Sequence, residues 1–137
     1  MNDTEAIQKF GLPADQKHRE EIRALLEEEL RKEGSWEGDH EPILCLVVQL
    51  FSIGHVEDCL LIWRIKSENF DLGCSVDVQL LCGAGIEQTK SYLAANGSQE
   101  ALAALACLQR CIDAGDFKEW SVPDGIAFYR QYYHIEI

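Results

Sequence analysis

The apolar stretch at residues 43–53 constrains the fold more than any other part of the chain. Its sequence, ILCLVVQLFSI, is interrupted only by Gln49 and Ser52, and Pro42 stands directly before it. A segment that is apolar on all sides is typical of a helix enclosed by neighbouring elements. The run is shorter than the roughly 18 residues that a membrane-spanning helix needs. We therefore expect a central core helix over residues 41–53, with Pro42 in its first turn.

A second helix is expected directly after Gly54. Glu57 and Asp58 stand where its positive N-terminal end should be, and Arg64 and Lys66 stand near its C-terminal end. This charge order matches the helix dipole, so the dipole alone explains the two acids at the start. Residues 42–70 thus predict a helical hairpin.

The remaining periodicity predicts further helices, so the fold class is all-α with about six to seven helices in one domain, residues 1–137. Residues 1–14 are expected to be a loose N-terminal segment in which one helical turn, with Ile7 and Phe10, docks on the rest of the domain. Residues 71–73, Asp-Leu-Gly, are expected to break the chain. Residues 75–82 also alternate as a strand would, but a lone strand would have no partner for its backbone, so we predict a helix capped by Ser75. The other predicted helices cover residues 15–33, 86–96, 98–114 and 121–133.

A weak internal similarity aligns Gly54 with Gly97 at a spacing of 43 residues. The length of this unit resembles that of HEAT-type α-solenoid repeats. It predicts stacked antiparallel helical hairpins, with residues 86–114 as the second copy. An irregular helix bundle, in which such hairpins arise by chance, stays open as the alternative.

The charge of the chain limits its partners. Acidic residues outnumber basic ones 24 to 12, which gives a formal net charge of −12. Such a surface disfavours nucleic acid and anionic membranes and attracts a basic protein or peptide. The first residues lack the apolar core of a secretory signal, so we expect a cytoplasmic protein. The six cysteines form no close C-x-x-C pair and are predicted to be free apolar residues, with no metal or cofactor bound.

Motifs that would specify an enzyme are absent from the sequence, including the phosphate-binding and nucleophile-elbow patterns. One polar cluster, His55 with Glu57 and Asp58, could hold a metal or move a proton at a helix start. In the helix at residues 15–33, Arg19 and Arg23 alternate with glutamates, which predicts a solvated face with pairs four residues apart.

Aromatic residues gather near the C-terminus. Phe128 and Tyr132 share one helix face, and Tyr129 and Tyr133 share the neighbouring one. We expect one pair to pack inward and the other to be partly exposed. Tyrosine and tryptophan are typical of protein interfaces, where an apolar ring carries a polar group. The residues that we assign to partner binding are Glu27, Glu28, Trp36, Trp120, Asp124, Tyr129 and Tyr133.

Together these features predict a non-catalytic, acidic helical module that holds a basic protein partner. In size and charge it is similar to bacterial immunity proteins that neutralise basic nuclease toxins, a resemblance that implies an inhibitor role. Two alternatives stay open: a small metal-dependent enzyme that uses His55, Glu57 and Asp58, and a structural subunit of a homo-oligomer. The sequence leaves the oligomeric state undetermined.

Overall fold

A computed structural model describes residues 1–32, 40–68 and 70–135. These residues form eight α-helices and two short 3₁₀ helices, η1 and η2, and contain no strand, so the predicted all-α class is confirmed. The elements are α1 (Asp3–Phe10), η1 (Gln16–His18), α2 (Arg19–Arg31), α3 (Glu41–Ile53), α4 (Asp58–Glu68), α5 (Phe70–Ser75), η2 (Val78–Cys82), α6 (Ile86–Asn96), α7 (Gln99–Asp113) and α8 (Val122–Tyr132).

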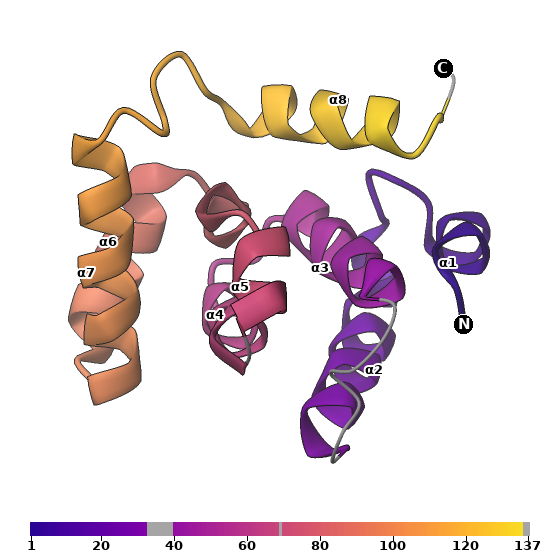
Figure 1. Cartoon of the computed structure of the whole chain (residues 1–137), viewed down its shortest axis with the longest axis horizontal. Helices are drawn as coiled ribbons and strands as arrows, with labels where there is room; N and C mark the ends of the chain where they lie inside the picture. The colour runs from indigo at the N-terminus through magenta and orange to yellow at the C-terminus, as the bar shows by residue number, and fades with distance from the viewer. Residues whose placement is uncertain (33–39, 69, 136–137) are drawn as a thin grey trace.

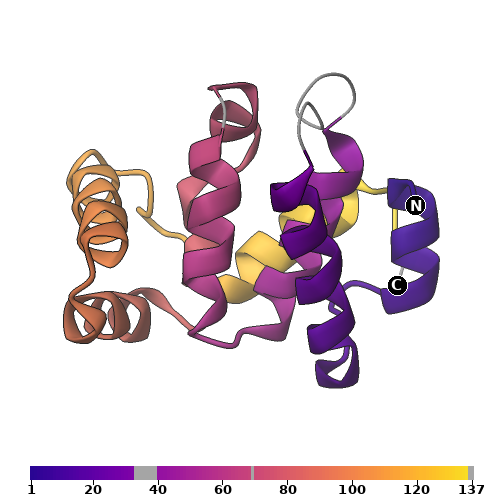
Figure 2. The same cartoon turned by 90° about the horizontal axis from the view of Figure 1, so that it is seen from below.

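Helix α3 is the centre of the molecule, as its sequence predicts. Every residue from Ile43 to Phe51 is buried, and the helix contacts α1, α2, α4 and α8. Figures 1 and 2 show it surrounded by these neighbours. The helix ends at Gly54, whose left-handed backbone (φ 83°) suits a residue without a side chain. Pro42 lies in the first turn, as expected.

The N-terminal segment is fixed to α3 by buried contacts. Asn2 caps α1 through a capping box with Glu5, and Ala6 and Phe10 are buried. The side-chain amide of Gln49 donates to the carbonyl oxygens of Ala6 and Gly11, at 2.9 and 3.0 Å. The NH2 group of Gln49, the one polar residue in the buried part of α3, therefore holds α1 in place, because a buried donor without an acceptor would be costly.

An ionic cluster joins α2 to α4, and it corrects the prediction of a fully solvated face on α2. Asp58 is only 1% exposed. Arg19 donates to both of its carboxylate oxygens, at 2.9 and 2.8 Å, and Arg23 donates to Oδ1 as well. The hydrogen bond from Arg19 to Asp58 raises the pKa of the guanidinium, against the effect of partial burial. The expected pair four residues along α2, Arg23 with Glu27, is also present.

The chain does not break at residues 71–73, where the sequence predicts it. Instead α5 runs through Gly73. The ammonium group of Lys66 donates to the carbonyl oxygens of Gly73 and Val76, at 2.6 and 2.5 Å. A cation at the negative end of a short helix satisfies carbonyls that the helix itself leaves free.

The ambiguous segment at residues 75–82 contains no strand: Ser75 ends α5, and Val78–Cys82 form the 3₁₀ helix η2, so the predicted helix is shorter and tighter than expected. Asp77 caps it by accepting the backbone N–H of Gln79 at 2.9 Å, in place of the expected Ser75. Its apolar residues Val78, Leu80 and Leu81 are buried.

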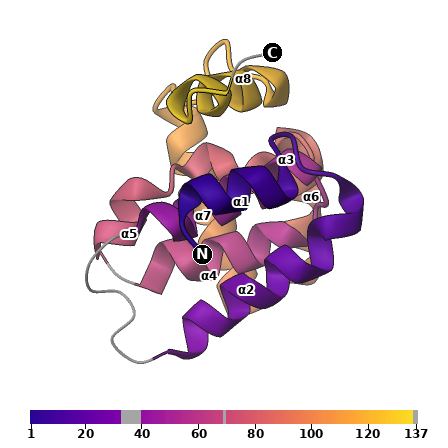
Figure 3. The same cartoon turned by 90° about the vertical axis from the view of Figure 1, so that its right-hand side faces the viewer.

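Helices α6 and α7 lie side by side at one end of the molecule (Figures 1 and 2). Helix α8 then crosses from that end towards α1, and it lies on the opposite side of the molecule from α2 (Figures 1 and 3). Gly97 ends α6 in the left-handed conformation, and Ser98 caps α7, as predicted. The finer prediction of stacked, repeated hairpins is not confirmed.

The burial of the thiols leads to a test of this fold. Cys45, Cys59 and Cys82 are buried, and desolvation raises their thiol pKa values to about 12, 12 and 11. Cys74 is exposed, while Cys107 and Cys111 are half-buried. Because the thiolate is the reactive form, a disulfide-exchange reagent at neutral pH should label Cys74 first and the three buried thiols only as the protein unfolds. Peptide mapping after timed labelling identifies each site, with denatured protein as the control; early labelling of Cys59 would contradict this fold.

Candidate functional site

Helix α8 begins as its sequence predicts and then approaches the core closely. Ser121 caps it by accepting the N–H of Asp124 at 3.3 Å, and proline occupies the first turn. Gly125 is buried; a Cβ atom at this position would lie 2.9 Å from Cζ of Phe51 and 3.2 Å from Cζ2 of Trp120. Only glycine allows the helix to sit this close to both rings.

A pocket of about 390 Å³ lies beside the first two turns of α8. We call it the N-terminal α8 pocket. It brings together three of the predicted binding residues, Trp120, Asp124 and Tyr129. The other lining residues were not among those that the sequence assigns to partner binding: Asp77, Gln79, Gly125 and Phe128.

The N-terminal α8 pocket combines carboxylates with aromatic rings. Asp77 and Asp124 are both exposed to solvent. Phe128 is 60% exposed and its ring lies edge-on to that of Tyr129, with centroids 5.0 Å apart. Burial, together with the nearby charge of Asp77, raises the pKa of Tyr129 to about 12, so its hydroxyl stays protonated at neutral pH. Carboxylates beside aromatic faces favour a cation, above all a planar guanidinium.

The indole of Trp120 is held in place from two sides. Its ring lies edge-on to Phe117, with centroids 5.4 Å apart, and tilted against Phe51 at 6.2 Å. These contacts leave the ring half-buried and fix its orientation at the pocket wall. A preordered aromatic wall costs a ligand less ordering entropy than a mobile one.

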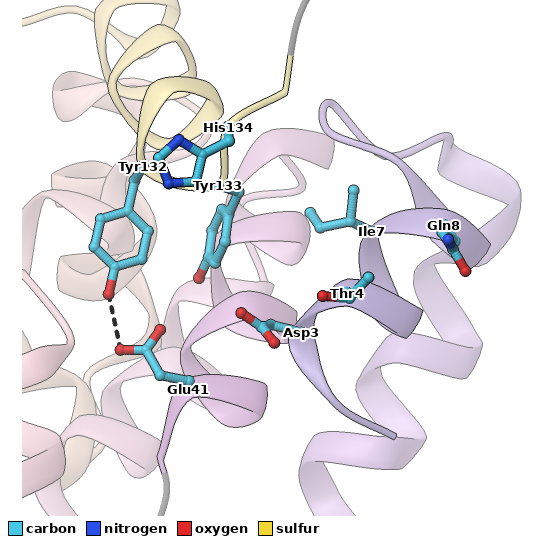
Figure 4. A pocket seen from close by; sticks show the side chains of 8 residues that line it. All are labelled: Asp3, Thr4, Ile7, Gln8, Glu41, Tyr132, Tyr133 and His134. Carbon is cyan, nitrogen blue, oxygen red and sulfur yellow. Dashed lines mark hydrogen bonds between the residues drawn. The ribbon is translucent and has the colours of Figure 1, made fainter.

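A second pocket, of about 410 Å³, lies at the other end of α8 (Figure 4). We call it the C-terminal α8 pocket. The hydroxyl of Tyr132 donates to Oε1 of Glu41 at 2.8 Å, and Asp3 faces Tyr133 from α1. Burial, with the neighbouring Cys45 and Glu41, raises the pKa of Tyr133 well above its usual range. Its lining residues are Asp3, Thr4, Ile7, Gln8, Glu41, Tyr132, Tyr133 and His134.

The two tyrosine faces of α8 separate as expected. Tyr129 and Tyr133 are half-buried and pack against the core, whereas Phe128 and Tyr132 are 60% and 44% exposed. The more accessible pair is therefore the one that the sequence prediction did not assign to a partner. Tyr129 and Tyr133 each reach the surface through one of the two pockets.

The predicted acidic residues of α2 lie apart from this surface. Glu27 and Glu28 belong to the helix on the opposite side of the molecule from α8 (Figure 3). Glu27 is half-buried and pairs with Arg23 at 3.3 Å, and Glu28 is exposed. Trp36, also predicted to bind a partner, lies outside the described residues.

Two of the three residues of the alternative site at His55, Glu57 and Asp58 belong to the ionic cluster. The carboxylate of Asp58 is taken up by Arg19 and Arg23, and Arg19 also lies 3.8 Å from Glu57. Across residues 1–32, 40–68 and 70–135, no group of three or more His, Cys, Asp or Glu side chains has an arrangement suited to a metal ion. Within the same residues, no helix combines the length and apolar character that a bilayer span requires.

Comparisons of the chain with protein-family models, with curated proteins and with solved structures find no match.

Proposed function

We propose that this chain is a non-catalytic, acidic protein-binding module that holds a basic protein partner along α8. The observation that carries the proposal is the N-terminal α8 pocket, where two carboxylates stand beside three aromatic rings. The net charge of −12 supports it, because a field of this sign speeds the approach of a basic partner and selects against acidic ones. Neutralisation of a basic toxin in the cytoplasm is one specific form of this role.

The partner could bind either of two acidic surfaces, α2 or the N-terminal α8 pocket, and variants that remove the same number of charges from each distinguish between them. The double variant D77N/D124N removes two charges at the N-terminal α8 pocket, and E27Q/E28Q removes two from α2. Asparagine keeps the helix-capping ability of Asp77. Because an exposed carboxylate that holds a cation contributes about 0.7 kcal/mol, the loss of two in D77N/D124N should weaken binding of a basic ligand about tenfold. E27Q/E28Q should weaken it less than about twofold.

A fluorescein-labelled peptide rich in arginine, spaced by glycine and serine, serves as the probe in fluorescence anisotropy. Its affinity should fall steeply between about 50 and 200 mM NaCl, as expected for exposed charge pairs. A peptide with glutamine in place of each arginine is the control for charge. Equal losses of affinity in the two double variants would show that the net negative charge of the whole surface attracts the peptide, and that α8 holds no specific site. No binding of the arginine peptide at low salt would overturn the proposal.

A further inference from the structure

We infer that α8 binds one extended segment of the partner through two cationic side chains about four residues apart, one in each α8 pocket. This inference rests on the proposed function and adds a spacing to it. A single pocket would accept any basic residue. Two pockets on one helix define a distance that the partner must match.

Both pockets have the chemistry of a cation site. The N-terminal α8 pocket contains Asp77 and Asp124, and the C-terminal α8 pocket contains Asp3 and Glu41. Among the residues that the structure describes, none of those lining either pocket is a lysine or an arginine. The basic residue in the intervening turn of α8, Arg130, donates to the carbonyl oxygen of Leu12 in the loop after α1.

A continuous row of aromatic rings connects the two pockets. Phe128 lies edge-on to Tyr129 (5.0 Å between centroids), Tyr129 to Tyr132 (6.0 Å), and Tyr132 to Tyr133 (4.9 Å). Phe128 lines the first pocket, and Tyr132 and Tyr133 line the second. The exposed rings of Phe128 and Tyr132 offer an apolar path between the two cation sites, along which the peptide backbone and small side chains can lie.

Helix geometry sets the spacing. Asp124 in the first pocket and Tyr132, whose hydroxyl donates to Glu41 in the second, are eight residues apart on α8, so the two pockets are separated by about 12 Å along the helix axis at 1.5 Å per residue. An extended chain advances about 3.3 Å per residue, so about four residues cover the same distance. Side chains at even spacings point to one side of an extended chain. Residues i and i+4 of a bound segment can thus enter both pockets together.

Arginine is the side chain that fits this surface better. Its planar guanidinium stacks on aromatic rings and forms paired hydrogen bonds to a carboxylate, which the compact lysine ammonium cannot do. The ligand class is therefore an extended basic peptide of the pattern Arg-x-x-x-Arg, with small residues between.

Peptides of identical composition test the spacing by fluorescence anisotropy. Each has two arginines in a glycine-serine chain, either adjacent or four residues apart. Because the second contact becomes intramolecular once the first has formed, the spaced peptide should bind about tenfold more tightly. The preference should disappear in D77N/D124N and in D3N/E41Q, each of which removes both carboxylates of one pocket, and should persist in E27Q/E28Q.

The outcomes separate this inference from the proposed function. Equal binding of the two peptides, with loss of affinity in D77N/D124N, would overturn the two-point mode and leave the basic-partner role intact. A preference for the spaced peptide that survives in both pocket variants would overturn the assignment to these pockets. Absence of binding by both peptides and by the arginine-rich probe would overturn the proposed function itself.

Discussion

The substitution Asp58→Ala should lower the free energy of unfolding by about 3 kcal/mol, at the lower end of the range for breaking a buried ion pair. The carboxylate is buried and accepts hydrogen bonds from Arg19 and Arg23. Without it, two guanidinium groups remain against the core with no counter-charge at that position. Both arginine side chains retain some contact with solvent, at 13% and 24% exposure, which limits the cost.

Urea denaturation followed by circular dichroism measures this effect. Glu100→Ala is the matched control, because it removes the carboxylate of the exposed pair between Arg64 and Glu100. Exposed pairs contribute at most about 1 kcal/mol, so the control should change the midpoint little. A loss in Asp58→Ala no larger than in Glu100→Ala would show that the cluster does not join α2 to α4 energetically. Asp58→Asn, which keeps the shape of the side chain, should also be destabilising.

The substitution Phe51→Ala should be at least as damaging, with an expected loss of about 4 kcal/mol for a large buried ring. Phe51 is 1% exposed and its ring lies under both Gly125 and Trp120. Removing the ring leaves a cavity between α3 and α8 and also removes the contacts that α8 makes with α3 through Gly125. Tryptophan fluorescence and urea denaturation together report both effects.

Phe128→Ala is the control for Phe51→Ala, since it is the same chemical change at an exposed position. It should change the free energy of unfolding by less than about 0.5 kcal/mol. It should nevertheless weaken the binding of the arginine-rich peptide, because Phe128 lines the N-terminal α8 pocket. If both substitutions destabilised the protein equally, Phe128 would have a core role that contradicts its exposure.

Local signals in the sequence predict most of the helices. The unbroken apolar run places α3, and Gly54, Ser98 and Ser121 mark helix ends through their backbone preferences and hydroxyl caps. These features act within a few residues of the chain. The error at residues 71–73 has a different origin, because the ammonium of Lys66, seven residues before Gly73, supplies the hydrogen bonds that let α5 continue.

The contacts that the sequence could not reveal join residues distant along the chain. Asp58 lies 39 residues from Arg19 in the sequence. An acidic residue at the start of a helix is explained by the helix dipole alone, so the sequence does not predict that Asp58 pairs with Arg19. The candidate site shows the same division. Trp120, Asp124 and Tyr129 are close in sequence, and the sequence predicts them together, whereas Asp77 reaches their pocket only because η2 packs beside α8. The sequence also assigns Glu27 and Glu28 to partner binding because of their negative charge, but α2, the helix that carries them, lies on the other side of the molecule from α8 (Figure 3).

Gly125 also restricts how the binding specificity of this surface can change during evolution. Any side chain at that position would meet the rings of Phe51 and Trp120, so the helix cannot slide or rotate without repacking the core. New ligand preferences must therefore arise from substitutions at exposed positions: at Asp124 and Phe128, and at Asp77 among residues that can still cap η2. Homologous chains that bind different partners should keep a glycine at this position and differ at those three.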